Sequence, residues 1–282
     1  MSKSSIHSFK TIVDPKKRNN FPDLKELFRY RDLFLVLAYR DLKVRYAQTF
    51  LGLAWALFQP IATLAAMMLI FQKALDIDTG DVPYVLYAFS GISAWTYFAF
   101  VLKESGNSVI GAGHVIKKIY FPRLIIPLSK AVVGLVDYCI TLVLLTGMMI
   151  WYSYVPGPEI FLLPLFILAT IISSLTVGIW VSALSIRYRD LQHIIPFFVQ
   201  FGLFVTPVAY PSELLIERIP KWASFLYYLN PMAGVVDGFR WCLFGGSPPH
   251  QLALFSYGVV VVFFIGSLYY FRRSERTLAD IV

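Results

Sequence analysis

Long apolar stretches alternate with shorter polar ones along most of the chain. A helix needs about 20 apolar residues to cross the hydrocarbon layer of a bilayer, and a helix pairs its own backbone groups there. Six stretches qualify, the fifth shorter than the others, and they cover about 50–72, 82–102, 128–152, 160–186, 194–210 and 251–271. The pattern therefore predicts an all-α integral membrane protein with six transmembrane helices per chain.

Lysine and arginine gather in alternate connections between these stretches. Twenty-one of the 25 lie before the first stretch, between the second and third, after the fourth and after the sixth. The other connections hold four, together with the acidic run Asp76, Asp78 and Asp81. Because cytoplasmic loops are enriched in Lys and Arg, we expect a transmembrane domain at 23–272 between two cytoplasmic tails, 1–22 and 273–282.

The composition supports a membrane protein. Hydrophobic residues make up 57% of the chain and charged residues 15%, whereas soluble domains are about half apolar and a quarter charged. The net charge of +8 suits nucleic acid or anionic lipid, and its one-sided distribution favours lipid, so we expect no nucleic-acid partner. The polar, basic start predicts no signal peptide, and the spacing of Cys139 and Cys242 indicates neither a disulfide framework nor a zinc site.

The segment 23–46 predicts an amphipathic helix that lies in the membrane plane ahead of the first span. Asp23 is suited to cap it, with Glu26 three residues on as in a capping box. Two interpretations stay open: a lipid anchor only, or the edge of a groove for a phosphate-bearing lipid head group. For that head group the candidate ligands are Arg40, Lys43 and Arg45, unless they only obey the positive-inside rule.

Two connections are unusual for simple loops. The outer segment 211–250 is long and apolar, and Asn230-Pro231 and Gly245-Gly246 are typical of a helix start and stop. We expect two short re-entrant helices there, which shape a vestibule or form a rigid cap. The cytoplasmic loop 111–123 predicts a compact helix that docks a soluble partner, or a solvated basic loop. Its candidate contact residues are His114, Ile116, Lys117, Ile119, Tyr120 and Phe121.

The chain contains few groups suited to catalysis. It has no Walker A motif and no GxGxxG after a strand, its four histidines lie in different segments, and no Ser/His/Asp grouping or metal-ligand spacing occurs. We therefore expect no enzyme activity, cofactor or metal in this chain. Asp137 lies near the middle of a span, where an ionisable residue is usually functional. An ion pair or hydrogen bond with another helix, a polar pore lining and proton coupling all remain open, and Lys130, about 10 Å away along the helix, is too far to be its partner.

Four stretches resemble one family, the ABC-transporter permeases that export polysaccharides, O-antigens and teichoic acids. They begin at Arg40 with RDLKVRYAQTFLGLAWALFQP, at Ile116 with IKKIYFPRLIIPLSK, at Ser185 with SIRYRDLQHIIPFFVQFGLFVTPVAYP and at Leu229 with LNPMAGVVDGFRWCLFG. The resemblance implies a homodimer in the bacterial inner membrane that works with two separate ATPase subunits, which hold the ATP and Mg²⁺. The implied substrate is an undecaprenyl-linked polysaccharide; the alternatives are a teichoic acid, a capsule, or a smaller lipid or drug.

The resemblance also implies aromatic belts along which sugar rings slide. The residues that match are Trp55, Phe58, Trp95, Tyr97, Phe98, Phe100, Phe197, Phe198, Phe201 and Phe204. The alternative for each is contact with lipid or with other helices. Two further function classes also remain, an ATP-independent carrier or scramblase and a scaffold subunit without a pore.

Overall fold

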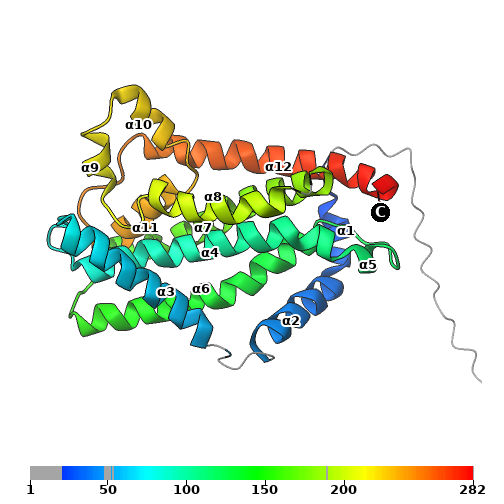
Figure 1. Cartoon of the computed structure of the whole chain (residues 1–282), viewed down its shortest axis with the longest axis horizontal. Helices are drawn as coiled ribbons and strands as arrows, with labels where there is room; N and C mark the ends of the chain where they lie inside the picture. Colours follow the sequence, from blue (N-terminus) through cyan, green and yellow to red (C-terminus); the bar gives the residue numbers. More distant parts are fainter. Residues whose placement is uncertain (1–20, 48–51, 53, 189, 282) are drawn as a thin grey trace, which may run out of the picture.

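The structure is a computed structural model that describes residues 21–47, 52, 54–188 and 190–281, the last six by their backbone alone. All regular elements in these residues are helices, and they form one elongated bundle (Figure 1). The all-helical class expected from the apolar pattern is therefore confirmed for the described part.

Five helical segments are long and apolar enough to cross a membrane. They are α3 with its π-helical continuation (Ala54–Ala74), α4 (Tyr84–Gly111), α6 (Ile125–Trp151), the 3₁₀ turn with α7 (Pro158–Arg187) and the Ala253–Glu275 part of α12 (Ala253–Ile281). The fifth expected span is α8 (Leu191–Val205), whose 15 residues reach about 22 Å at 1.5 Å per residue. By length alone, α8 does not meet the criterion for a sixth span.

The central helix of the bundle is α4, which packs against α3, α6, α7 and α8. Small residues let its neighbours approach closely, as is usual between membrane helices. A Cβ atom added to Gly178 of α7 would lie 3.1 Å from the Cβ of Ser105 on α4. Several buried hydroxyls bond to carbonyls of their own helix, such as Ser93 to the carbonyl of Ser90 at 2.9 Å, whereas the hydroxyls of Ser173, Ser182 and Ser185 lack a partner among the described residues. The core therefore holds polar side chains, and several of their hydroxyls are paired within their own helix.

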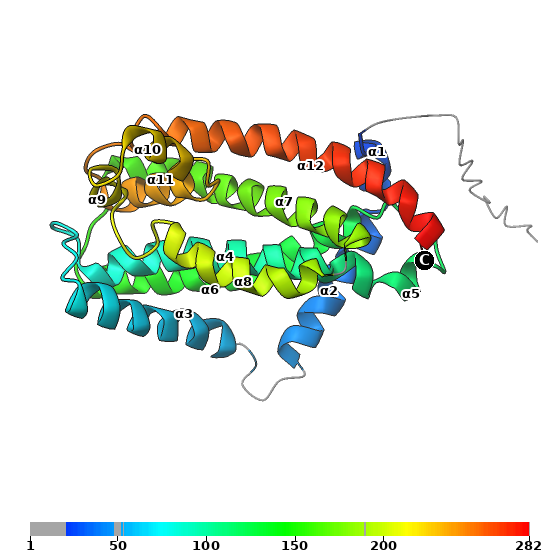
Figure 2. The same cartoon turned by 45° about the horizontal axis from the view of Figure 1, so that its top comes forward.

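Short helices gather at the two ends of the bundle (Figures 1 and 2). One end, called the α5 end here, holds α1 (Leu24–Arg29), α5 (Gly113–Ile116) and the last turns of α12. The opposite end, the α11 end, holds α9 (Ser212–Ile216), α10 (Lys221–Tyr227) and α11 (Ala233–Phe244). The segments expected to be unlike simple spans thus lie at the ends of the bundle.

The helix expected over 23–46 is divided at Tyr30 into α1 and α2 (Arg31–Ala47). As expected, Asp23 caps α1, and its Oδ1 accepts a hydrogen bond from the backbone nitrogen of Lys25 at 2.9 Å. Glu26, expected to complete a capping box, instead accepts a hydrogen bond from the Tyr120 hydroxyl at 3.2 Å. This contact joins α1 to the loop that follows α5.

The region 211–250 contains three short helices where two were expected. Pro220 separates α9 from α10 because proline cannot continue a helix through its own position without losing a hydrogen bond. Asn230 precedes α11, and its Oδ1 accepts a hydrogen bond from the backbone nitrogen of Met232 at 3.0 Å. Gly245 ends α11 with a φ of 69°, which only glycine adopts without strain.

Candidate functional site

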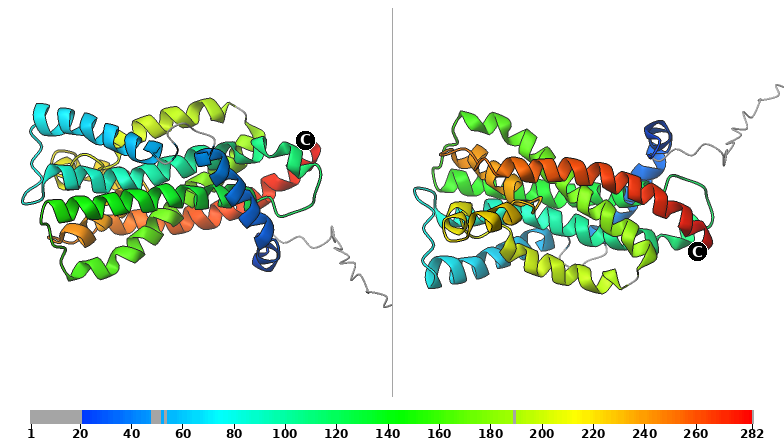
Figure 3. Two further views of the ribbon diagram at one scale, coloured as in Figure 1. Left: turned by 90° about the horizontal axis from the view of Figure 1, so that it is seen from below. Right: turned by 90° about the horizontal axis from the view of Figure 1, so that it is seen from above.

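The helix α2 lies across α6 (Figure 3). Two ion pairs connect the two helices, and each helix supplies the acid of one pair and the base of the other. In the first pair, Lys130 Nζ of α6 lies 2.9 Å from Asp41 Oδ2 of α2. The same carboxylate accepts from Arg40 Nη2 at 2.8 Å through its other oxygen. Asp41 therefore holds a basic group of its own helix and one of the neighbouring helix.

In the second pair the acid is on α6 and the base on α2. Asp137 Oδ2 accepts from Arg45 Nη2 at 2.5 Å, and its Oδ1 accepts from the Tyr46 hydroxyl. The Arg45 guanidinium also lies 4.5 Å from the centre of the Phe100 ring, a favourable cation–π contact. Of the interpretations left open for Asp137, the structure places it in an ion pair with another helix.

The three candidate ligands for a lipid head group differ in exposure and in their partners. Arg45 was expected to face a lipid phosphate, but its side chain bonds to Asp137 and is only 37% exposed. Arg40 is bound to Asp41 and remains exposed, and Lys43 is exposed on the same helix. A buried carboxylate needs a cationic partner, and for Asp137 that partner is Arg45.

The loop 111–123 lies at the α5 end and presents several of its predicted contact residues. His114, Lys117, Ile119 and Tyr120 are exposed, and Ile116 is half-buried. Phe121, which was expected to face a partner, is buried at 3% exposure. Its ring packs in a cluster with three apolar residues of α2 and α6: Leu37, Ile125 and Ile126. Phe121 therefore attaches the loop to α2 and α6, and the preceding loop residues Ile119 and Tyr120 remain on the exposed surface.

Polar contacts tie this loop to both α1 and α12. The Arg123 backbone nitrogen donates to Glu275 Oε1 at 3.1 Å, and Arg123 Nη1 donates to the Glu275 carbonyl at 2.7 Å. Glu275 also accepts from Arg272 Nη1 at 2.6 Å. Burial, and then the nearby Glu26 carboxylate, raise the pKa of Tyr120, so this hydroxyl stays protonated and donates to Glu26. The loop is thus connected by hydrogen bonds to α1 and to α12.

The predicted channel aromatics fall into two groups. Those on α3 and α8 are exposed: Trp55, Phe58, Phe197, Phe198, Phe201 and Phe204. Trp95, Tyr97 and Phe98 of α4 are buried because α4 occupies the centre of the bundle. Trp95 and Phe98 nevertheless line a groove of about 480 Å³ together with Phe198 of α8, and their role as a channel lining stays a prediction. Phe100 is half-buried and lies beneath Arg45.

The exposed aromatics share one side of the bundle. Both views in Figure 3 show α3 and α8 along the same side of the molecule. Within each helix the rings contact one another, Trp55 with Phe58 at 5.6 Å and Phe197 with Phe201 at 4.2 Å between ring centroids. We use the term aromatic face of α3 and α8 for these exposed rings, which include one contacting pair on each helix.

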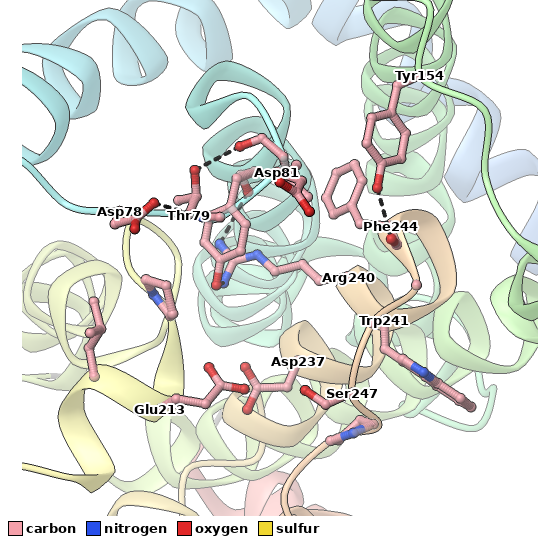
Figure 4. Close-up of a pocket in the computed structure, with 18 residues that line it drawn as sticks. Asp78, Thr79, Asp81, Tyr154, Glu213, Asp237, Arg240, Trp241, Phe244 and Ser247 are labelled. Atoms are coloured by element: carbon pink, nitrogen blue, oxygen red, sulfur yellow. Dashed lines mark hydrogen bonds between the residues drawn. The ribbon is translucent and has the colours of Figure 1, made fainter.

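A pocket of about 560 Å³ at the α11 end was not anticipated from the sequence. It lies between the 78–82 loop, α9, α11 and the segment 245–249 (Figure 4). Carboxylates of Asp78, Asp81, Glu213 and Asp237 line it, together with the aromatic rings of Tyr87, Tyr154, Trp241 and Phe244. Figure 4 shows the Glu213 and Asp237 carboxylates turned toward each other. The acidic loop at Asp76 to Asp81 was the sequence signal that could have indicated it.

Arg240 closes the pocket on its inner side. Its guanidinium is buried and donates to the carbonyls of Pro207 at 2.5 Å and Val208 at 2.6 Å, and to the Tyr87 hydroxyl at 2.9 Å. It also lies 3.7 Å from the centre of the Tyr87 ring. These bonds satisfy the carbonyls just after α8, so Arg240 fixes that segment to α11 and α4.

Asp237 stands beside Arg240 on α11, which is not one of the spanning helices. It accepts hydrogen bonds from the Ser212 hydroxyl at 2.5 Å and the Tyr228 hydroxyl at 3.1 Å. Burial raises the pKa of Asp237 to about 6, opposed by the Ser212 hydrogen bond and by Arg240. In the described part of the chain, no group of three or more His, Cys, Asp or Glu side chains is suited to hold a metal ion.

Comparison with known proteins matches the chain over most of its length. A sequence profile of the family described as ABC-2 type transporter matches residues 32–244. The O-antigen export system permease protein RfbA of Myxococcus xanthus is 26% identical over 255 residues, which cover 89% of this chain and 96% of that protein. A protein of the same name from Klebsiella pneumoniae is 25% identical over 252 residues, covering 89% and 95%. The polysialic acid transport protein KpsM of Escherichia coli is 23% identical over 251 residues, covering 86% and 93%.

Proposed function

The chain belongs to the ABC-2 type transporter family, and on this basis we propose that it is the membrane-spanning subunit of an exporter of lipid-linked cell-surface polysaccharide. The observation that carries the proposal is the match to export permeases along almost their entire length. The aromatic face of α3 and α8 supports it, because flat rings stack on the apolar faces of sugars without fixing one position.

The energy source in this proposal is a separate ATPase subunit. The chain has no Walker A motif for the phosphates of ATP, so ATP and Mg²⁺ belong to the partner. The exposed residues of the loop 111–123 offer the contact surface, in particular Ile119 and Tyr120, which are 48% and 54% exposed. Apolar side chains exposed beside basic ones at one end of a bundle are typical of a protein contact.

The topology proposed here has six crossings and both termini in the cytoplasm of a bacterium. The chain leaves α7 near the α5 end and starts α12 at the α11 end, and α8 runs alongside α4 between these ends (Figure 2). The segment after α8, through Tyr210, extends this crossing. The surplus of Lys and Arg at the α5 end supports a cytoplasmic location for that end, and the membrane proposed here is the inner membrane.

Two copies of the chain complete the channel in this proposal. One copy presents exposed aromatic rings along α3 and α8, where most side chains are not covered by the rest of the bundle. A second copy facing this side encloses a passage lined by aromatic rings from both. Arg40 and Lys43, exposed on α2, are proposed to meet the phosphate groups of the lipid carrier, since Arg and Lys are common phosphate ligands.

The docking surface is tested with the complete transporter, purified with its ATPase subunit. We expect Ile119→Ala combined with Tyr120→Ala to abolish the stimulation of ATP hydrolysis by the permease while the thermal stability of the permease changes little. Tyr120→Phe removes only the hydrogen bond to Glu26 and separates that contact from docking. Trp222→Ala, an exposed apolar residue at the α11 end, is the matched control and keeps stimulation intact. Normal binding and stimulation by the double variant would remove this surface from the proposal.

A further inference from the structure

The pocket at the α11 end has the chemistry of a sugar-binding site. Its volume of about 560 Å³ falls within the range of small-ligand pockets. Tyr154, Trp241 and Phe244 are half-buried, so each leaves part of its ring available. The rings of Tyr154 and Phe244 meet edge to face at 5.5 Å, and the Tyr154 hydroxyl donates to the Phe244 carbonyl at 2.8 Å. The aromatic wall is therefore held in place before any ligand arrives.

Carboxylates between and beside these rings supply hydrogen-bond acceptors. Asp78 and Asp81 come from the loop before α4, Glu213 from α9 and Asp237 from α11. In the described residues, none of these four carboxylates forms an ion pair. An ionised carboxylate only accepts hydrogen bonds, so these four residues suit a ligand with many hydroxyl donors.

Positive charge in the pocket is too little to balance these four acids. Among the described residues that line it, Arg240 is the one Lys or Arg. Its donors are already occupied by the carbonyls of Pro207 and Val208 and by the Tyr87 hydroxyl. With all four acids ionised, the lining carries a net charge of about −3, and like charges at short distance repel.

We infer that this pocket binds an uncharged sugar unit of the exported polysaccharide and disfavours anionic sugars. The inference rests on the proposed function and narrows its substrate to neutral glycans. The aromatic rings of the lining receive the apolar face of the sugar, and the carboxylates beside them receive its hydroxyl groups. An anionic sugar such as sialic acid would place its carboxylate among four others, where the N–H groups of Arg240 are already bonded to carbonyl and hydroxyl oxygens.

The pocket is open on one side, as a site for one unit of a longer polymer requires. Gly80, Gly245 and Gly246 stand at its edge, all with positive φ. A Cβ atom added to Gly80 or Gly246 would meet no atom within 4 Å. The rim therefore leaves room for a chain that continues beyond the bound unit.

The test measures sugar binding to the complete permease–ATPase complex in lipid nanodiscs. Mannotetraose serves as the neutral probe and a sialic acid tetramer as the anionic one, with binding followed by calorimetry. We expect the neutral tetramer to bind at least fivefold more tightly than the anionic one. Trp241→Ala should weaken neutral binding by about tenfold, and Trp241→Phe, which keeps a ring, should restore most of it.

Charge removal tests the selectivity itself. Asp78→Asn, Asp81→Asn and Glu213→Gln together should reduce the difference between the probes to twofold or less. Glu217→Gln, an exposed residue that follows α9, is the matched control and should leave both affinities unchanged. Equal or tighter binding of the sialic acid tetramer by the unmodified complex, or no binding of mannotetraose, would overturn the inference. ATP-dependent export by the same complex is measured in parallel, and its absence would instead overturn the proposed function.

Discussion

Where α2 crosses α6, charged side chains of the two helices are joined in pairs, whereas at the α11 end carboxylates face a cavity without ion-pair partners among the described residues. Asp41 and Asp137 each connect α2 with α6. Asp78 and Glu213, in contrast, line an open pocket. Carboxylates therefore join two helices in the first region and remain available to a ligand in the second.

The two regions also differ in the partners of their arginine side chains. Arg45 is 37% exposed and pairs with a carboxylate. Arg240 is 5% exposed and binds carbonyl oxygens. An ion pair such as that of Arg45 joins two helices through side chains alone. The hydrogen bonds of Arg240 to several carbonyls instead hold one arrangement of the backbone. We therefore expect the α11 end to be the more rigid frame and the contact between α2 and α6 to be the more adjustable one.

Arg240→Ala gives the largest effect expected from this difference. It leaves the carbonyls of Pro207 and Val208 without their donor, at about 1 to 3 kcal/mol for each buried unsatisfied group. We expect a loss of about 2 to 6 kcal/mol in unfolding free energy, seen as a lower midpoint in detergent-based thermal unfolding. Arg218→Ala, an exposed residue at the same end, should stay within about 0.5 kcal/mol of the parent. Similar midpoints for the two variants would refute the rigid-frame view of the α11 end.

Gly238→Ala tests the packing around the same helix. A Cβ atom there would lie 1.9 Å from Cε1 of Phe166 on α7, so either the ring or α11 must move. Overpacking of this kind costs about 1 to 3 kcal/mol. Gly147→Ala on α6 meets nothing within 4 Å and should instead stabilise the helix by about 0.5 to 1 kcal/mol. Thermal unfolding of both variants reports the sign directly, and a stabilised Gly238→Ala protein would contradict the packing described here.

The ion pair between Arg45 and Asp137 gives an intermediate effect. A double-mutant cycle with Arg45→Ala and Asp137→Ala isolates their coupling from other changes. We expect a coupling of about 1 kcal/mol, reduced from that of a fully buried pair because Arg45 is partly exposed. Asp41→Ala with Lys130→Ala forms the corresponding cycle for the other pair. Additive single effects in both cycles would show that α2 is held by apolar contacts alone.

The sequence indicated the spans and the polar ends but not which side chains meet. Uniformly apolar helices lack a polar face, so nothing in the sequence separates the buried Trp95 from the exposed Phe198. Arg45 and Asp137 are 92 residues apart, and a single sequence does not reveal that they pair. Phe121 follows two exposed residues in the loop, and its burial depends on α2.

The outer pocket escaped prediction for a similar reason. Its carboxylates come from three separate segments that fold together, and each alone resembles a solvated surface residue. Arg240 was counted only as one basic residue on the outer side, although an arginine inside an apolar short helix is itself a signal of burial with partners. The sequence thus predicts elements well, and contacts between distant elements require the structure.

The pH dependence of stability gives the smallest expected effect. Burial raises the pKa of Asp237 from its ordinary value to about 6. The folded protein therefore binds this proton more tightly than the unfolded chain, so the associated stability is present at low pH and is lost as the pH rises through about 6. The difference in melting temperature between the parent and Asp237→Asn should accordingly favour the parent more at pH 5 than at pH 7. The same difference at both pH values would show that Asp237 is ionised throughout this range.

The central claim is that this chain exports a lipid-linked glycan only together with an ATPase subunit. The most direct measurement reconstitutes the purified permease into liposomes that carry lipid-linked polysaccharide, with and without that ATPase subunit. A glycosidase confined to the compartment on the α11 side reports translocated glycan. The account predicts cleavage that requires ATP and the ATPase subunit together. Cleavage at the same rate with the permease alone would contradict it and identify the chain as an ATP-independent scramblase.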